Sequence, residues 1–246
     1  MGNMISRRSV IACGVAALAC SGLSSMALGD ESKKIESATV QPSPDMEPDE
    51  VLSLIERDFS DTTDRINSSL DDTIAKLGST FDEYVENFGA LGEWLRKVDD
   101  ETARLAERTE ENVLVYYRSL VSHVDPEGDS KTFDKAADEV YDTIYDDLYD
   151  DFYDAIYEDA FDLLNDEIYD GILDEKPEKV DYGYYSKTRS TMYRGMSGAR
   201  SRVYQNISNG RSAIYNLRSD MSSAFFNDVY DVDEALWWRD LGGSVE

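Results

Sequence analysis

The chain has 246 residues, and its 52 acidic side chains against 24 basic ones give a formal charge of −28 at pH 7. A surface this acidic repels nucleic acid and bare anionic membranes unless one face is locally basic, so we expect no nucleic-acid partner. The length is sufficient to bury a real hydrophobic core.

The N-terminal residues have the order of segments found in a secretory signal peptide. Residues 1–8 carry two arginines and no acid, residues 9–19 are mostly apolar, and small residues follow up to a candidate cleavage site after Gly29. The apolar run is too short to span a membrane. The stretch SRRSVI resembles a twin-arginine export signal, with an ordinary secretory route as the alternative. We therefore expect residues 1–29 to be removed and the protein to be exported, to the cell envelope or outside the cell.

Both cysteines of the chain, Cys13 and Cys20, lie within this signal. Cys20 follows a small residue and offers an alternative fate, in which the exported protein is anchored by a lipid. If the signal is removed instead, the mature chain holds no cysteine, and hence no disulfide and no thiolate metal ligand.

The next part of the chain is predicted to be a spacer followed by a helical block. Residues 30–48 are polar, contain three prolines, and are predicted to be disordered. Residues 49–124 contain no proline, and their apolar side chains recur in steps of three and four, as on one face of a helix. Gly78 can end one helix, and Thr80 with Glu83 has the spacing of a capping box. The apolar phase continues across this point, so a single long helix is the alternative.

The segment YDTIYDDLYDDFYDAIYEDAF has an aromatic residue at every fourth position from Tyr141 to Phe161, and an acid follows each one. From Ala136 to Glu175 there are 16 acids and no base. Four residues of an α-helix turn about 400°, so this aromatic ladder drifts by about 40° per step. The apolar residue before each aromatic widens the stripe. We therefore predict a helix whose broad apolar face winds around it.

Residues 184–230 repeat every eleven residues. The copies are RSTMYRGMSGA from Arg189, RSRVYQNISNG from Arg200, RSAIYNLRSDM from Arg211 and a degenerate SSAFFNDVYDV from Ser222. Eleven residues in three turns predict a slight right-handed supercoil. From Tyr182 to Ser219 there are seven bases and no acid, the opposite of the preceding segment.

These charges predict an antiparallel hairpin over residues 133–230, joined by a turn at Pro177, in which the ladder faces the repeats. We expect arginines to lie over tyrosine rings and beside aspartates. The fold class is therefore all-α, an elongated antiparallel helical bundle or coiled coil with 11-residue repeats. Residues 231–246 are predicted to form a short helix and a tail, in which Trp237 and Trp238 cover the end of the bundle or form a binding patch.

A Tyr-Asp ladder followed by Arg-Ser-x-apolar-Tyr eleven-mers, over about residues 141–230, resembles a loose group of uncharacterised exported bacterial proteins. The resemblance implies export and a helical structure, and it carries over no activity.

The sequence has no enzyme signature. His123 is the one histidine, and without cysteines it cannot build a usual zinc site. The GMSG stretch at 195–198 is one residue short of a nucleophile elbow, and there is no Walker loop or dinucleotide fingerprint. Acids at every fourth position from Asp142 to Asp170 lack the glycine turn of an EF-hand loop, and we interpret them as a solvated or arginine-paired face. We predict no catalytic residue, cofactor or metal.

Two functions remain. The first is a structural or protein-interaction module with a protein partner or with itself as partner. The alternative is an amphipathic protein that binds a lipid or membrane surface, since arginines and tyrosines beside an apolar stripe suit that use. The candidate interaction residues are Arg189, Arg200, Arg211, Arg218, Tyr193, Tyr204, Tyr215, Trp237 and Trp238.

Overall fold

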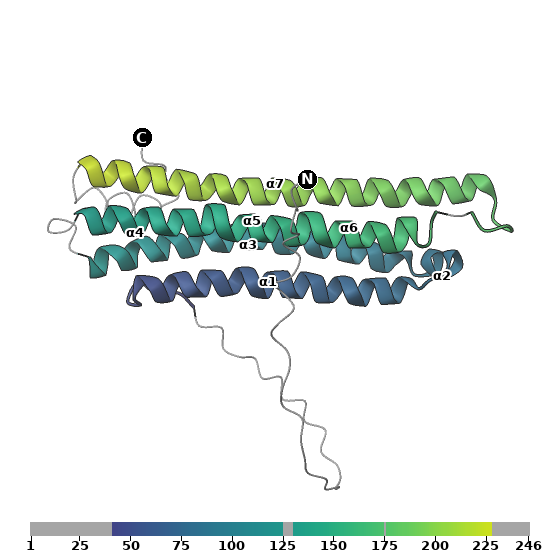
Figure 1. Ribbon diagram of the computed structural model, residues 1–246, viewed down its shortest axis with the longest axis horizontal. Helices are drawn as coiled ribbons and strands as arrows, with labels where there is room; N and C mark the ends of the chain where they lie inside the picture. The colour runs from purple at the N-terminus through teal and green to yellow at the C-terminus, as the bar shows by residue number, and fades with distance from the viewer. Residues whose placement is uncertain (1–40, 125–129, 175, 228–246) are drawn as a thin grey trace, which may run out of the picture. The chain divides into compact units, whose positions relative to one another are not determined.

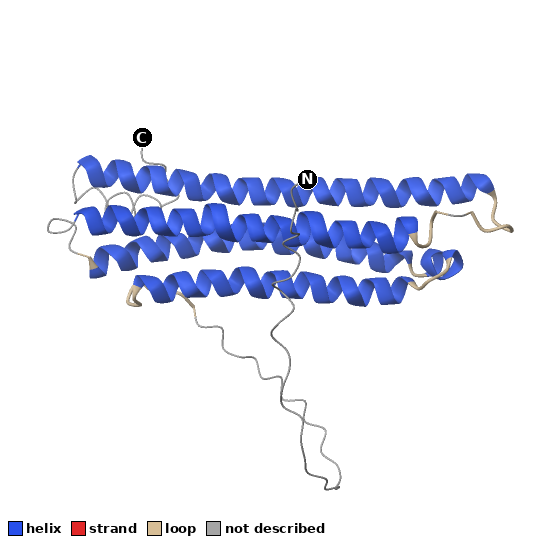
Figure 2. Cartoon of the chain, viewed as in Figure 1, coloured by secondary structure: helices blue, strands red, loops and turns tan. Residues whose placement is uncertain are grey.

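The computed structural model describes residues 41–124, 130–174 and 176–227. The predicted signal peptide, the Cys20 anchor and the C-terminal helix with Trp237 and Trp238 lie outside these ranges. Within them the chain is all-α, as predicted, with helices and no strand (Figure 2). The described helices belong to one unit and are α1 (Pro48–Leu77), α2 (Phe81–Glu86), α3 (Phe88–His123), α4 (Ser130–Asp142), η1 (Thr143–Leu148), α5 (Tyr149–Phe152), η2 (Tyr153–Ala160), α6 (Phe161–Leu164), η3 (Asn165–Asp170) and α7 (Tyr182–Asn227).

Four long helical runs lie side by side and alternate in direction along the chain (Figure 1). The segments from α4 to η3 follow one another without a break and form one run, which we call the ladder helix. α1 packs on α3, and α7 packs on both α3 and the ladder helix. α7 has 46 residues and is therefore about 69 Å long.

The first helical block is broken at Gly78, so it forms separate helices and not a single long one. Gly78 has φ 80°, a left-handed conformation that ends α1 at low cost only for glycine. The hydroxyl of Thr80 accepts a hydrogen bond from the Glu83 N–H at 3.3 Å, and the Glu83 carboxylate accepts one from the Thr80 N–H at 3.1 Å. The capping box is thus present, and α2 begins directly after it. Hydrogen bonds from Ser79 and Thr80 lower the pKa of the Glu83 carboxyl.

The last residues of the predicted spacer, 43–47, lie against the bundle. Residues 43–46 form a turn, in which the Met46 N–H donates to the Ser43 carbonyl at 3.1 Å. The hydroxyl of Ser119 in α3 donates to the Met46 carbonyl at 2.5 Å, and Met46 packs against the core. The chain is therefore held on the bundle before α1 begins at Pro48.

Buried side chains recur every eleven residues in the three long α-helices α1, α3 and α7. In α1 one such row is Val51, Thr62 and Thr73, and another is Ile55, Ile66 and Leu77. In α3 the rows include Leu91, Thr102 and Val113, and in α7 they include Met192, Val203 and Ile214. Steps of three and four that sum to eleven hold a buried row nearly parallel to the helix axis. The apolar positions predicted for residues 49–124 are, with few exceptions, those that the bundle buries.

The ladder helix differs from the prediction, because it alternates between α-helical and π-helical turns. A π turn is closed by a bond from residue i to residue i+5 and holds more residues than an α turn. The mixed helix therefore makes about one turn every four residues, and a period-four stripe runs straight along it. The expectation of a winding apolar face is wrong for this reason. The straight stripe is Ile144, Leu148, Phe152, Ile156, Ala160, Leu164 and Ile168.

The innermost stripe of the ladder helix thus consists of the residues before the aromatics. Most ladder tyrosines lie along its flank and are half-buried, whereas Tyr149 and Phe161 are fully buried. The ring of Tyr149 meets Phe59 of α1 edge-on, with 5.0 Å between ring centroids. Phe161 meets Trp94 of α3 at 5.4 Å. As predicted, the ladder residues pack against their own chain. The ladder helix contacts α1, α3 and α7.

Candidate interaction surface

Three arginines at one position of the eleven-residue repeat each lie over a tyrosine ring of the ladder helix. The pairs, with the distance from guanidinium carbon to ring centroid, are Arg189 over Tyr169 (4.5 Å), Arg200 over Tyr157 (4.4 Å) and Arg211 over Tyr145 (5.5 Å). The predicted contact between arginines and tyrosine faces is confirmed. Each is an electrostatic attraction to the ring, worth about 0.5–1 kcal/mol at a partly exposed site.

The spacing of these pairs shows how the two helices keep register. The arginines are 11 residues apart and the tyrosines 12 residues apart. Twelve residues of the ladder helix therefore cover the same length as eleven residues of α7, about 16.5 Å. Each twelve-residue unit of the ladder helix contains one π segment. The wider π turn accommodates the one residue by which this unit exceeds the eleven-residue repeat of α7. Stacked tyrosine pairs recur with the same period, Tyr141 on Tyr145 and Tyr153 on Tyr157.

Aspartates of the ladder helix pair with two of these arginines, Arg200 and Arg211. Arg200 Nη1 lies 3.2 Å from Asp162 Oδ1, and Arg211 pairs with Asp150. Arg218, the fourth candidate arginine, pairs with Asp134 at 3.2 Å and with Asp138, and Arg189 Nη1 donates to the Tyr185 hydroxyl at 3.2 Å. Pairs this exposed add about 0–1 kcal/mol each, so they fix orientation more than stability. All four candidate arginines are thus engaged within the chain.

The tyrosines of the repeats lie along the flank of α7 that borders the ladder helix, where the ring of Tyr204 lies 6.4 Å from that of Tyr153 and 6.0 Å from that of Tyr157. Eleven residues turn about 1100°, only 20° beyond three full turns, so side chains at this spacing form a nearly straight row. The exposed fractions along the row are 71% for Tyr182, 63% for Tyr193, 54% for Tyr204 and 59% for Tyr215. Of six large apolar side chains that are exposed in the described residues, five are tyrosines of α7.

The row lies between the ladder helix, whose Asp150 and Asp162 are exposed, and polar side chains of α7 that include no acid. Ser190, Ser201 and Ser212 precede the tyrosines by three residues and are exposed, which places them on the same side of α7. Arg194 and Lys187 add positive charge. We call this surface the tyrosine face and define it as Tyr182, Lys187, Ser190, Tyr193, Arg194, Ser201, Tyr204, Ser212 and Tyr215. At the Tyr182 end it opens into a groove of about 660 Å³ beside Tyr169 and Arg189.

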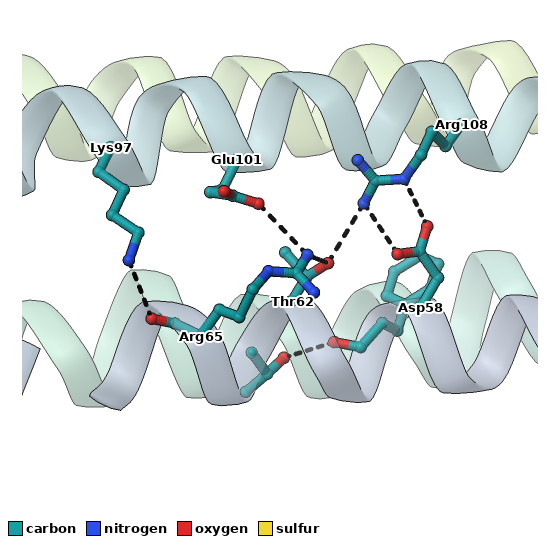
Figure 3. A network of polar contacts seen from close by, with 8 residues as sticks. Asp58, Thr62, Arg65, Lys97, Glu101 and Arg108 are labelled. Atoms are coloured by element: carbon teal, nitrogen blue, oxygen red, sulfur yellow. Dashed lines mark hydrogen bonds and ion pairs between the residues drawn. The ribbon is translucent and has the colours of Figure 1, made fainter. Parts of the chain in front are cut away.

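A second concentration of charged contacts is a polar cluster between α1 and α3 (Figure 3). Arg108 donates two hydrogen bonds of 2.8 Å to the two carboxylate oxygens of Asp58 and a third, of 3.3 Å, to Thr62. The hydrogen bond with Asp58 is the main cause of a raised pKa of Arg108. Arg65 bridges Thr62 and Glu101 at 2.8 and 3.3 Å. These groups satisfy one another, so the cluster joins α1 to α3 and presents no reactive group.

The other chemical candidates also have structural partners. His123 Nδ1 lies 2.8 Å from the Ser119 carbonyl, and its Nε2 lies 3.6 Å from Glu47. The described residues contain no group of three or more His, Cys, Asp or Glu side chains that could hold a metal ion. No helix among them is long and apolar enough for a membrane span.

Gly210 lies where α7 meets Tyr149, and its substitution gives a sharp prediction. A Cβ atom at Gly210 would overlap the Tyr149 hydroxyl oxygen, and it would lie 2.7 Å from Tyr149 Cζ and 3.1 Å from Ala106 Cβ. We expect Gly210→Ala to lower the free energy of unfolding by about 1–3 kcal/mol, because the ring of Tyr149 cannot retreat from Phe59. Urea unfolding followed by circular dichroism measures this loss.

Gly195→Ala is the matched control in the same helix. Its new Cβ would meet only Leu95 Cδ1, at an ordinary 3.5 Å. Alanine has the better helix propensity, so this substitution is expected to add up to about 1 kcal/mol. Equal effects of the two substitutions would show that helix propensity, and not contact with Tyr149, determines the result at Gly210.

No family model, curated protein or solved structure matches the chain.

Proposed function

We propose that the chain is an exported, non-enzymatic helical protein that acts as a protein-interaction module in the cell envelope or outside the cell. The observation that carries this proposal is the tyrosine face, a row of four exposed tyrosines on a helix that has no acid from Tyr182 to Ser219. Tyrosine supplies a large, rigid contact area at a low entropy cost, and it is enriched at the centres of protein interfaces. Serine, asparagine and glycine, which are also frequent on α7, supply adaptable polar contacts on binding surfaces.

The positions of the arginines favour a protein partner over a lipid surface. A lipid-binding helix presents its arginines beside an apolar stripe that can enter the bilayer boundary. Here Arg200 and Arg211 lie over ladder tyrosines and pair with ladder aspartates. The apolar stripe of α7, which contains Met192 and Val203, is buried in the bundle. Lipid binding would therefore require the hairpin to open and the buried core to separate.

Site-specific photo-cross-linking in the cells that make the protein tests this proposal. A photoreactive aromatic residue at position 204 is expected to form adducts with protein. The same residue at position 163 is the control, because Leu163 is 42% exposed on the acidic ladder helix. The proposal fails if position 204 gives no protein adduct while the purified protein floats with anionic vesicles at physiological salt. That result would support the membrane-surface alternative.

A further inference from the structure

We infer that Arg189 binds a carboxylate of a partner protein, presented by a short segment that carries one aspartate or glutamate among apolar residues. The inference rests on the proposed function, because it names the chemistry of the partner at one end of the proposed surface. Arg189 lies in the groove at that end, which shares Tyr182 and Tyr193 with the tyrosine face.

In two repeats of α7 the arginine at this position has two partners on the ladder helix, a tyrosine ring and an aspartate five residues after that tyrosine. The two sets are Arg211 with Tyr145 and Asp150, and Arg200 with Tyr157 and Asp162. The same spacing continues by one twelve-residue unit to Tyr169 and Asp174. Arg189 lies over Tyr169 at 4.5 Å, so Asp174 is the aspartate that this register assigns to it.

Asp174 does not pair with Arg189, because the ladder helix ends before it. The last helical segment, η3, ends at Asp170, and Asp174 lies in the turn that follows. Among the described residues no carboxylate forms an ion pair with Arg189 or with Arg194, the second arginine of the groove. Arg189 therefore keeps the ring contact of the other repeats and lacks their carboxylate.

The guanidinium of Arg189 is held in place by the chain itself. Its Nη1 donates to the Tyr185 hydroxyl at 3.2 Å. That hydroxyl lies 2.7 and 2.9 Å from the carbonyl oxygens of Leu173 and Asp174, so the turn fixes the buried tyrosine and the tyrosine fixes the arginine. A guanidinium presents its N–H donors in a planar fork that matches a carboxylate. A fork that is already fixed binds such a group at a lower entropy cost.

Tyrosines and serines complete the groove and favour a protein segment as its ligand. The groove has a volume of about 660 Å³, within the usual range for a binding site, and Ser186 and Ser190 lie on it beside the tyrosines. Tyr182 is 71% exposed and Tyr193 is 63% exposed. Tyrosine and arginine are enriched among the residues that dominate protein interfaces. Apolar side chains next to the acid of the ligand can pack on these rings.

The acids of the chain limit how acidic the ligand can be. No acid lines the groove, but Asp170 and Asp181 are exposed and adjoin lining residues in the sequence. A run of acids in the ligand would meet these carboxylates as well as the arginines, and like charges repel. A single carboxylate can contact the guanidinium directly, while charges more than about 8 Å away are largely screened at physiological ionic strength. The ligand is therefore a segment with one acid and not a polyacid.

Selection of random eight-residue peptides displayed on phage, with the purified protein as the target, tests this site. We expect the selected peptides to share one aspartate or glutamate with apolar neighbours. Fluorescence anisotropy of a labelled selected peptide then measures its affinity. Arg189→Gln is expected to weaken binding by about tenfold or more, because it removes one member of a charged pair. Arg200→Gln is the control, since Arg200 has the same ring contact and an aspartate of its own, and binding should not change.

A carboxylate placed on α7 itself should block the site. Ser186 lines the groove and precedes Arg189 by three residues, which places the two side chains side by side on the helix. Ser186→Asp is therefore expected to weaken peptide binding by about tenfold or more. Ser197→Asp adds the same charge three residues before Arg200 and should leave binding unchanged. Circular dichroism checks that the variants keep the helicity of the wild type.

Three results would overturn the site. The first is equal binding of the peptide by the Arg189→Gln and Arg200→Gln variants. The second is selection of peptides that contain no acid, and the third is binding of polygalacturonate, a carboxylated polysaccharide, without any acidic peptide. If no acidic peptide is selected while position 204 still cross-links to protein, the site at Arg189 is overturned and the proposed function stays in place.

Discussion

Deletion of Gln205 from α7 is expected to unfold the second half of that helix, although Gln205 itself is exposed. Removal of one residue from an α-helix rotates everything beyond it by about 100°. The rotation would move a set of buried side chains out of the core, and each contributes about 1.5–3 kcal/mol through burial. The total is comparable with the whole stability of a typical domain, about 5–15 kcal/mol. The side chains are Ile207, Ile214, Leu217 and Met221.

The same deletion in the ladder helix is expected to be tolerated if Asp159 is the residue removed. Asp159 is exposed and lies in η2, which holds the additional residue of its twelve-residue unit. Without Asp159, this unit of the ladder helix has eleven residues and can form three ordinary α turns. Its length then equals that of one eleven-residue repeat of α7. Tyr157 and Asp162 would then be four residues apart, about one α turn, and both could still contact Arg200. We expect a change in stability of at most about 2 kcal/mol.

Thermal melts followed by far-ultraviolet circular dichroism compare the two deletions. The Gln205 deletion should lose both helicity and a cooperative transition, whereas the Asp159 deletion should keep both. If the two deletions are equally damaging, the π segment does not take up the additional residue. The correspondence of twelve ladder residues with eleven residues of α7 would then have another cause.

The sequence predicted the buried positions of the α-helices better than those of the ladder helix. In residues 49–124, α-helical spacing identified buried positions such as Ile66 and Val98, because those helices have the period that the rule assumes. The ladder has a period of four, and in an ideal α-helix its stripe would wind out of contact. Burial against α1, α3 and α7 stabilises wider turns instead. The repetition of Tyr145, Tyr157 and Tyr169 at twelve residues, beside repeats of eleven, is the signal that could have indicated the wider turns.

The exposure of the repeat tyrosines could not be predicted in the same way. Each repeat places an aliphatic residue directly before its tyrosine, as in Met192 and Tyr193. Either residue can enter a core, since tyrosine combines an apolar ring with a polar hydroxyl. Packing against the neighbouring helices determines which of the two residues is buried. In this bundle Met192 is buried and Tyr193 is exposed. The bond between Asp58 and Arg108 was missed for a related reason, because 50 residues separate the two side chains.

Alkaline pH is expected to unfold the bundle through four buried tyrosines, Tyr84, Tyr116, Tyr117 and Tyr149. Burial is the main cause of a raised pKa for each, and together with Asp49 and Glu139 it raises the pKa of Tyr116 to about 12. In the unfolded chain tyrosine loses its proton near pH 10. Between pH 10 and the folded-state pKa the folded protein therefore binds more protons than the unfolded one, and stability decreases with pH. The loss is about 1.4 kcal/mol per pH unit for each tyrosine, so four of them can remove the whole stability between about pH 11 and 12.

Phenylalanine substitutions distinguish this cause from a general effect of charge. The hydroxyl of Tyr84 is buried without a hydrogen-bond partner, so Tyr84→Phe should leave stability at pH 7 nearly unchanged. The hydroxyl of Tyr149 lies beside the side chain of Thr109, so Tyr149→Phe should lower the stability at pH 7 by at most about 1 kcal/mol. Each should raise the midpoint of alkaline unfolding, which circular dichroism and tyrosinate absorbance measure together. Tyr193→Phe and Tyr204→Phe are the controls, because these rings are exposed in the folded protein. An unchanged midpoint in the Tyr84 and Tyr149 variants would show that repulsion among the acids, and not ionisation in the core, drives the transition.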